Sequence, residues 1–173
     1  KVNLGAGVYK NDQGITPILD SVKQAERLLL DEEQTKSYLP ISGDPLYTAC
    51  VQRLMFGEDS EVIASGRAAT AHAPGGTGAL RIGGELIQKF NPGATMWISS
   101  PTWANHHGIF GAAGFQLKNY PYYNSDTKGL SYGEFISALA QVPAGDVVLL
   151  HGCCHNPTGV DLEPTQWGEV AAL

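Results

Sequence analysis

The sequence predicts an α/β protein of three layers, in which a mainly parallel sheet has helices on both faces. Two observations indicate this fold. Short runs of β-branched and apolar residues alternate along the chain with longer segments whose apolar residues recur at helical spacing. Polar loops rich in glycine, proline and asparagine follow several of these runs. Since strands that alternate with helices join through right-handed crossovers, the strands should run parallel and end at a common edge.

Two helices are predicted in the first part of the chain. Thr16-Pro17 supplies an N-cap and a first-turn proline, and apolar residues at helical spacing continue through Leu30. This segment should form an amphipathic surface helix. Asp44-Pro45 repeats the capped start, and a second apolar stripe ends near Gly57.

Extended structure or loop is expected on either side of the first helix. Residues 2–9 mix strand formers with two glycines, one of them Gly7, so this backbone can approach a ligand closely and offer its amides to an anion. A plain surface turn explains the segment equally well. Tyr38 lies beside a proline and a glycine that exclude regular structure, which places it on a loop.

The rest of the chain alternates between strand and helix patterns. Four runs are strand candidates, namely residues 69–73, 95–99, 115–120 and 146–150. Helical patterns occupy residues 79–90, a stretch that runs towards Ala113, a stretch capped by Ser131, and a last segment that begins at Pro164.

The composition favours one domain that binds a small ligand. With 173 residues, 43% of them hydrophobic, the chain can bury a core. Its 11 Lys and Arg against 17 Asp and Glu give no support for nucleic-acid binding. Three cysteines, two of them adjacent, cannot form a disulfide framework and favour a reducing compartment. Because neither a bilayer-length apolar stretch nor a signal peptide is visible, we expect a cytoplasmic protein without a membrane partner.

A glycine loop before the helix at 79–90 is a candidate phosphate site. Its sequence, Pro-Gly-Gly-Thr-Gly at 74–78, would present free backbone N–H groups at the positive end of the helix dipole. The Gly-Lys-Ser/Thr of a Walker A motif is absent, and so is the glycine spacing of dinucleotide-binding loops. A purely structural turn explains this motif, taken alone, as well as a phosphate site does.

Two further loops follow predicted strands at the same edge. Trp103 could offer a flat face to an aromatic ligand, although tryptophan is more often a core residue. Asn156 precedes Pro157, which restrains its backbone, even to a cis bond, and so aims its amide; an ordinary turn is the alternative. A phosphate cradle, an aromatic face and a directed amide together suit a phosphorylated aromatic ring.

The histidines and cysteines before Asn156 also raise the question of a metal site. The sequence His-Gly-Cys-Cys-His at 151–155 places four potential ligands within five residues. Adjacent cysteines with such short flanks do not match the usual spacing of zinc ligands, so no metal is expected. Taken alone, each histidine is more readily explained as a core or surface residue than as a functional one.

Three motifs together resemble the aspartate and aromatic-amino-acid aminotransferases, fold-type I enzymes that depend on pyridoxal 5'-phosphate (PLP). They are Pro-Gly-Gly-Thr-Gly-Ala-Leu-Arg at 74–81, Ser-Pro-Thr-Trp-Ala-Asn-His at 100–106 and His-Gly-Cys-Cys-His-Asn-Pro-Thr-Gly at 151–159. The resemblance runs from Val2 to the last helix. It implies transfer of an amino group between an amino acid and a 2-oxo acid such as 2-oxoglutarate. Whether aspartate alone or also aromatic amino acids serve as donors is left open.

The resemblance also implies roles for individual residues around the cofactor. Gly75, Gly76 and Thr77 would hold the phosphate group, Trp103 would stack on the pyridine ring, and Asn156 would bond the ring's 3-oxygen. Trp103 and Asn156 would contact the substrate as well.

Four other residues acquire expected roles in the same way. Gly7 would lie against the substrate carboxylate. Tyr38 would reach the phosphate bound by a neighbouring subunit, which makes a homodimer with shared active sites the expected assembly. His106 and His151 would support the acidic residue that pairs with the pyridine nitrogen.

By the same resemblance, residues 1–173 form a single partial domain, comprising the start of the aminotransferase core and the front half of the PLP-binding large domain. The Schiff-base lysine, the acidic partner of the ring nitrogen and the arginines for the substrate carboxylates would follow Leu173. No lysine of the chain is predicted at the edge formed by the three loops. We therefore expect no catalytic residue in these 173 residues and no transamination by them alone.

Two other functions are consistent with the same residues. A fold-type I PLP enzyme with different chemistry, such as a lyase, would use the same cofactor site. A catalytically silent binding or assembly protein would transfer no amino group even when the cofactor is supplied.

Overall fold

Helix α1 (Asp20–Glu32) lies in the first of two units, residues 1–40 and 41–173. The computed structural model describes residues 7–173. The predicted N-cap at Thr16 is wrong, because the N-cap position is Leu19 and no side chain caps the helix there. Asp20 instead places a carboxylate in the first turn, where it interacts favourably with the helix dipole. Within this unit the apolar side chains of α1 are exposed, as in a surface helix.

Helices α2 (Pro45–Phe56) and α3 (Glu61–Ala64) begin the second unit. Asp44 caps α2 as predicted, since its Oδ1 accepts a hydrogen bond of 2.9 Å from the Tyr47 N–H. Gly57 ends the helix with a φ of 87°, which glycine adopts without steric cost. Helix α3 is not predictable from the sequence pattern, because one helical turn is too short to display a period.

Residues 69–73, a predicted strand, do not belong to any sheet. Their backbone makes an isolated contact in which the His72 N–H donates to the Ser42 carbonyl at 2.8 Å. A strand requires a neighbour whose backbone pairs along its length, and this segment has none among the described residues. The strand predicted at residues 69–73 is therefore wrong.

The central sheet contains three parallel strands, which confirms the predicted α/β architecture. Their spatial order is β2 (Gln116–Pro121), β1 (Thr95–Ser100) and β5 (Val147–Val148). Strand β5 is shorter than the apolar run at 146–150, although the Leu149 N–H still donates to the Trp97 carbonyl at 2.8 Å. An antiparallel hairpin of β3 (Tyr123–Asn124) and β4 (Gly129–Leu130) follows β2.

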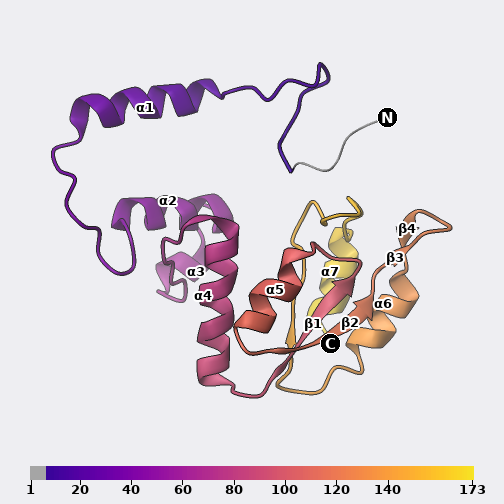
Figure 1. The fold of residues 1–173 in the computed structure, drawn as a ribbon. Helices are drawn as coiled ribbons and strands as arrows, with labels where there is room; N and C mark the ends of the chain where they lie inside the picture. Colours follow the sequence, from indigo (N-terminus) through magenta and orange to yellow (C-terminus); the bar gives the residue numbers. More distant parts are fainter. Residues whose placement is uncertain (1–6) are drawn as a thin grey trace. The chain divides into compact units, whose positions relative to one another are not determined.

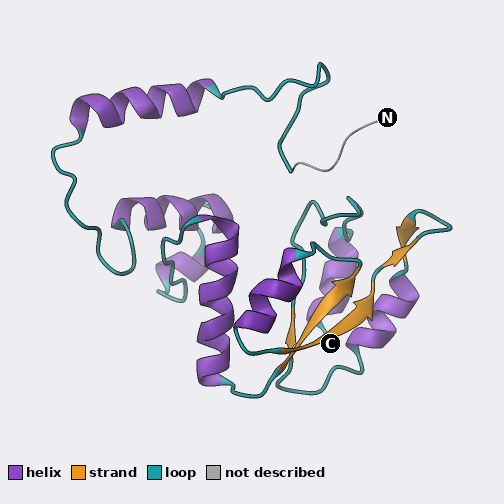
Figure 2. Cartoon of the chain, in the orientation of Figure 1, coloured by secondary structure: helices purple, strands orange, loops and turns teal. Residues whose placement is uncertain are grey.

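Helices cover both faces of this sheet, as Figures 1 and 2 show. On one face, Met96 and Ile98 pack in a cluster with Phe110. On the other face, Trp97 packs in a second cluster around Phe135. Burying an apolar side chain of this size contributes roughly 1.5–3 kcal/mol, so the alternation along β1 holds three layers together. The covering helices are α4 (Gly75–Phe90) and α5 (Asn105–Ala112) on the first face and α6 (Tyr132–Leu139) and α7 (Pro164–Ala171) on the second.

Helices α4 and α5 approach each other closely at Gly84, the buried glycine of α4. A Cβ atom at this position would lie 3.2 Å from the Ala113 Cβ and 3.2 Å from the Phe110 Cδ1. The absence of a side chain therefore lets α5 lie against α4. Because both helices begin at the edge where the strands end, this contact brings their first turns towards the same part of the molecule.

Asp146 joins the start of β5 to the start of β1. Its carboxylate accepts hydrogen bonds from the Thr95 N–H and the Trp97 Nε1–H, each 2.9 Å long. The bond from the Trp97 indole and then that from the Thr95 amide hold the pKa of Asp146 below its ordinary value. A carboxyl group with a lowered folded-state pKa stabilises the fold above its unfolded pKa of about 4, and this stabilisation is lost as pH falls through the folded pKa.

We therefore expect Asp146→Asn to lower the thermal unfolding temperature near neutral pH. Below pH 4 the difference from the wild-type protein should shrink, because the wild-type carboxyl group becomes protonated. Unfolding followed by circular dichroism from pH 7 to pH 2.5 measures both effects. Asp126→Asn, on the exposed turn between β3 and β4, is the matched control and should change neither. A constant difference across this pH range would contradict the role of the Asp146 charge.

Candidate active site

Trp103 lies in the connection from β1 to α5, beyond the carboxyl end of β1. The bond Ser100–Pro101 is cis, and the Trp103 carbonyl accepts a 3.0 Å hydrogen bond from the His106 N–H. The half-buried indole meets the His106 ring edge to face, at 5.3 Å between centroids and an interplanar angle of 89°. The connection thus presents an indole at the edge of the sheet, as predicted.

Asn156 lies in the loop that follows β5. The Asn156–Pro157 bond is cis, and Cys154 has a φ of 52°. Asp161 ties the loop together, because its two carboxylate oxygens accept the N–H groups of Cys154 and His155 at 2.8 Å each. The hydrogen bond from His155 and then that from Cys154 keep the pKa of Asp161 below its ordinary value. An ionised Asp161 therefore holds the turn that carries Asn156 near neutral pH.

These two loops line one cavity of about 240 Å³, here called the sheet-edge cavity. It brings together Trp103, His106, His151 and Asn156, four of the residues predicted at the site. Its remaining lining residues come from α4 and from the segment that follows β5, namely Leu80, Leu149, Leu150 and Cys153. An aromatic face, an amide and two imidazoles thus surround a space with an apolar floor.

A chain of hydrogen bonds connects the two histidines of this cavity. Thr102 Oγ1 lies 2.7 Å from His106 Nδ1 and 3.4 Å from His151 Nε2. The Asn156 N–H donates to His151 Nδ1 at 3.0 Å. Since His151 Nδ1 accepts this hydrogen bond, the neutral ring carries its proton on Nε2 and can donate to Thr102. The network therefore selects one tautomer of His151.

Both imidazoles are neutral near pH 7. Burial, followed by the neighbouring His151 ring, lowers the pKa of His106. Burial also lowers the pKa of His151, and Asp161 opposes this effect. A neutral imidazole has one donor nitrogen and one acceptor nitrogen. Each ring can therefore bond Thr102 through one nitrogen and use the other for a further hydrogen bond.

The first turn of α4 contains Gly75, Gly76 and Thr77, predicted to form a loop before the helix. The helix begins earlier than predicted because Pro74 occupies the N-cap position, and Gly75 follows with a φ of 67°. No side chain caps this end, so its amides remain available to an anion. Nothing lies within 4 Å of a Cβ atom built at Gly75 or Gly76, so the two glycines are not crowded on that side.

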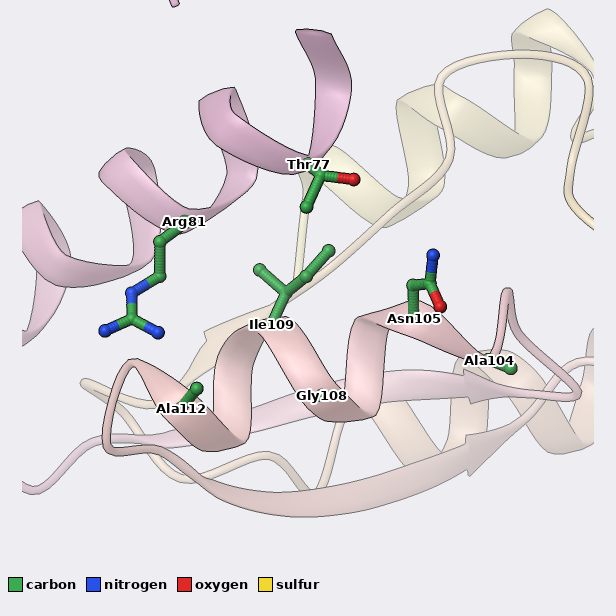
Figure 3. Close-up of a pocket in the computed structure, with 7 residues that line it drawn as sticks. All are labelled: Thr77, Arg81, Ala104, Asn105, Gly108, Ile109 and Ala112. Atoms are coloured by element: carbon green, nitrogen blue, oxygen red, sulfur yellow. The ribbon is translucent and has the colours of Figure 1, made fainter. Parts of the chain in front are cut away.

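Thr77 faces a second cavity, of about 430 Å³, between α4 and α5. Figure 3 shows Thr77 and Arg81 on α4 and Asn105 and Ile109 on α5 around this space. Leu80 on the next turn of α4 lines the sheet-edge cavity instead. The structure therefore brings Trp103, His106, His151 and Asn156 into one cavity and sets the first turn of α4 beside them, without including its glycines in the lining.

A phosphorylated aromatic ring fits the residues present. Uncapped amides at the positive end of α4 suit a phosphate group, the indole of Trp103 offers a stacking face, and Asn156 offers an amide. No carboxylate lines the sheet-edge cavity within the described part of the chain, so the walls do not repel an anionic group. Among residues 7–173, no cluster of three or more potential metal ligands is found.

Comparison with known proteins decides the family. The whole chain, residues 1–173, matches the family described as Aminotransferase class I and II. The chain belongs to the class I and II aminotransferases. This membership confirms the resemblance seen in the three sequence motifs and agrees with the layered fold around a parallel sheet.

Individual relatives resemble this aminotransferase chain in both sequence and structure. It is 53% identical over 173 residues to an aspartate aminotransferase of Haemophilus influenzae, covering 100% of this chain and 44% of the relative. It is 47% identical over 170 residues to an aromatic-amino-acid aminotransferase of Pseudomonas aeruginosa, covering 98% and 42%. A crystal structure of an aromatic-amino-acid aminotransferase from Burkholderia pseudomallei, covalently bound to pyridoxal phosphate, superimposes with a TM-score of 0.93 at 47% identity, covering 99% and 43%. The chain thus spans less than half the length of these relatives.

Two expected site residues of the aminotransferase chain lie in its first unit. Gly7 is exposed, with nothing within 4 Å of a Cβ atom built on it. Tyr38 is on a loop, as predicted, and its side chain is fully exposed within that unit. Their expected contacts with substrate and phosphate stay predictions.

No helix in residues 7–173 is both long and apolar enough to cross a membrane.

Two polar residues around the site of this aminotransferase chain are not predicted from the sequence. Thr102 connects the histidines of the sheet-edge cavity, and His155, which precedes Asn156 in the sequence, is buried with 2% of its surface exposed. Polar residues directly after a buried strand signal a ligand edge, which could have singled out Thr102. The signal for His155 is weaker, because its contacts are with Ser99 of β1 and with the ring of Tyr122, both distant in the sequence.

Proposed function

We propose that the whole protein to which this chain belongs transfers an amino group between an amino acid and a 2-oxo acid, with PLP as cofactor. The sheet-edge cavity carries this proposal, because it joins an aromatic face to an amide and two neutral imidazoles beside an uncapped helix start. Relatives named as aspartate and aromatic-amino-acid aminotransferases, and one relative's covalently bound pyridoxal phosphate, support the same assignment.

The described residues would hold PLP through three kinds of contact. The first-turn amides of α4 at Gly75, Gly76 and Thr77 would bind the phosphate, Trp103 would stack on the pyridine ring, and Asn156 would donate to the 3-oxygen. When bound, PLP supplies an electron sink for the carbanion that forms when a substrate loses its α-proton. The protein's contribution in this region is to orient the ring and set its protonation.

The pair of histidines would stabilise the acidic residue that pairs with the pyridine nitrogen. His106 and His151 are joined through Thr102, and the Asn156 amide holds His151 in one tautomer. A fixed, neutral pair of rings can orient a carboxyl group without competing with it for a proton. Gly7 would leave room for the substrate carboxylate, because it carries no side chain.

A direct assay tests this function. The purified whole protein should bind PLP and convert aspartate and 2-oxoglutarate into oxaloacetate and glutamate in equal amounts. Loss of the amino donor without equimolar glutamate would indicate a lyase instead. If the protein neither binds PLP nor turns over any amino donor, the silent binding or assembly function would replace the proposal.

The donor amino acid is proposed to be aspartate, and whether aromatic amino acids also serve is decided by the comparison of donors below. Aspartate aminotransferases and aromatic-amino-acid aminotransferases both match the chain, at 53% and 47% identity in the examples above. Discrimination between side chains depends on the contacts made by the whole pocket. Comparing kcat/KM for aspartate and phenylalanine in the whole protein therefore assigns the range, and undetectable turnover of phenylalanine would limit it to acidic donors.

We further propose a homodimer in the cytoplasm whose active sites are shared through Tyr38. The exposed phenol supports a contact with another subunit, and three free cysteines suit a reducing compartment. If Tyr38 serves the neighbour's phosphate site, Tyr38→Phe should weaken PLP binding. Mixed dimers in which only one subunit can bind PLP separate the two subunits' contributions. The single remaining site should bind PLP weakly when Tyr38→Phe is in the other subunit, and normally when Tyr38→Phe is in the subunit that binds PLP. Dissociation constants unchanged by the partner's genotype would contradict a shared site.

A further inference from the structure

His155 is a buried, neutral side chain that the proposed function leaves without a role. Only 2% of its surface is exposed, and it ranks among the largest fully buried side chains of the described chain. Burial, followed by the nearby His151 ring, lowers its pKa to about 4, with a smaller opposing effect of Asp161. A buried histidine needs partners for both ring nitrogens, and the structure provides them.

The ring of His155 connects the end of β1 to the loop that carries Asn156. Its Nε2 lies 2.9 Å from Ser99 Oγ, which is itself buried on β1. Its Nδ1 lies 2.8 Å from Thr158 Oγ1, on the far side of the cis Asn156–Pro157 bond. Each hydroxyl can donate or accept, so a neutral ring satisfies both contacts in either tautomer.

Flat faces restrain the same ring from both sides. The Tyr122 ring stacks on it at a centroid distance of 4.0 Å and an angle of 10°. The His151 ring stacks on the opposite side at 4.1 Å and 19°. His151 in turn accepts the backbone N–H of Asn156. The backbone of Asn156 is therefore restrained twice. It is covalently joined to His155, and its N–H is bonded to His151, whose ring stacks on His155.

We propose that His155 is a positioning residue, which joins β1 to the loop and so holds the Asn156 amide towards the bound cofactor. This inference rests on the proposed function, because Asn156 is the group that would contact the cofactor. His155 lies one position before Asn156 but is absent from the lining of the sheet-edge cavity. It acts through Asn156 and makes no contact with the reacting atoms.

The test compares His155→Phe with Asn156→Ala in the whole protein. Phenylalanine keeps a flat ring between Tyr122 and His151 but removes both hydrogen bonds. Freed from Ser99 and Thr158, the loop should place the Asn156 amide poorly, which raises the midpoint pH of the bound cofactor's absorbance change by about one unit. His107→Phe, at an exposed position of α5, is the matched control and should leave that midpoint in place.

A double variant separates positioning from general damage to the fold. If His155 acts through Asn156, adding His155→Phe to Asn156→Ala should not move the midpoint further. A shift that persists undiminished in the Asn156→Ala background would overturn the proposal, and so would an unshifted His155→Phe protein. If His155→Phe does not fold, Ser99→Ala carries the same comparison, because it removes one partner of the imidazole and little volume.

A crystal structure of the cofactor-free His155→Phe or Ser99→Ala protein gives a readout that does not depend on the proposed function. We expect the Asn156 side chain to leave its wild-type position in either variant. An Asn156 amide that stays in place would refute the positioning role even if the protein proves to have another activity. Conversely, a wild-type protein that binds no PLP would refute the proposed function while this structural comparison still decides the role of His155.

Discussion

Replacing Trp103 by alanine is expected to weaken PLP binding by about 10- to 100-fold, because an aromatic ring stacked on a heteroaromatic base contributes roughly 1–3 kcal/mol. The fold should survive the change. Trp103 is half-buried in a connecting loop, and the hydrogen bond from the His106 N–H goes to its backbone carbonyl, which alanine retains. Titrating the cofactor-free protein with PLP measures the dissociation constant.

Two further variants make this measurement specific. Trp103→Phe keeps a smaller aromatic face and should bind PLP with an affinity between those of the wild-type and alanine proteins. Trp167→Phe, on α7 in the cluster beneath the opposite face of the sheet, changes a tryptophan away from the cavity and should bind PLP normally. An alanine variant with wild-type affinity would remove the stacking role of Trp103.

Sequence patterns predict the regular part of the fold well because its causes are local. The alternation of side chains along β1 and the Asp44 cap of α2 both follow from the identities of neighbouring residues. Predictions fail where a partner element decides the outcome. Residues 69–73 have strand-forming character but no adjacent strand, and the amides at Gly75 belong to a helix turn because Pro74 can take the N-cap position.

The residues of the candidate site likewise include some that local sequence predicts and some that depend on distant partners. Trp103 and Asn156 are predictable, because each lies in a loop directly after a strand of a parallel sheet and such loops gather at one edge. The role of Thr102 and the burial of His155 depend on contacts across 49 and 56 positions of sequence, respectively, which no local pattern contains. Motif resemblance assigns residues to the candidate site, and the tertiary contacts show how those residues are held.

Replacing Asn156 by alanine is expected to change the protonation of bound PLP more than its affinity. A hydrogen bond to a charged group contributes about 1.5–3 kcal/mol, and one pKa unit corresponds to 1.36 kcal/mol. Losing the amide donor at the 3-oxygen should therefore raise the midpoint of the cofactor's pH-dependent absorbance by about one to two units. The dissociation constant should change less than in Trp103→Ala, since the stacking face and the first turn of α4 remain. Asn119→Ala, at an exposed position of β2, serves as the control.

The shift in Asn156→Asp tests whether the side chain at position 156 lies against the 3-oxygen. An ionised aspartate can only accept hydrogen bonds, and its negative charge beside the 3-oxygen further disfavours the deprotonated form of the cofactor. The midpoint should therefore rise at least as far as in Asn156→Ala, because the aspartate removes the donor and adds a repulsive charge. The backbone N–H of residue 156 still reaches His151 Nδ1 in both variants, so the loop keeps that anchor. Absorbance titrations of the two variants that return the wild-type midpoint would show that Asn156 does not contact the ring.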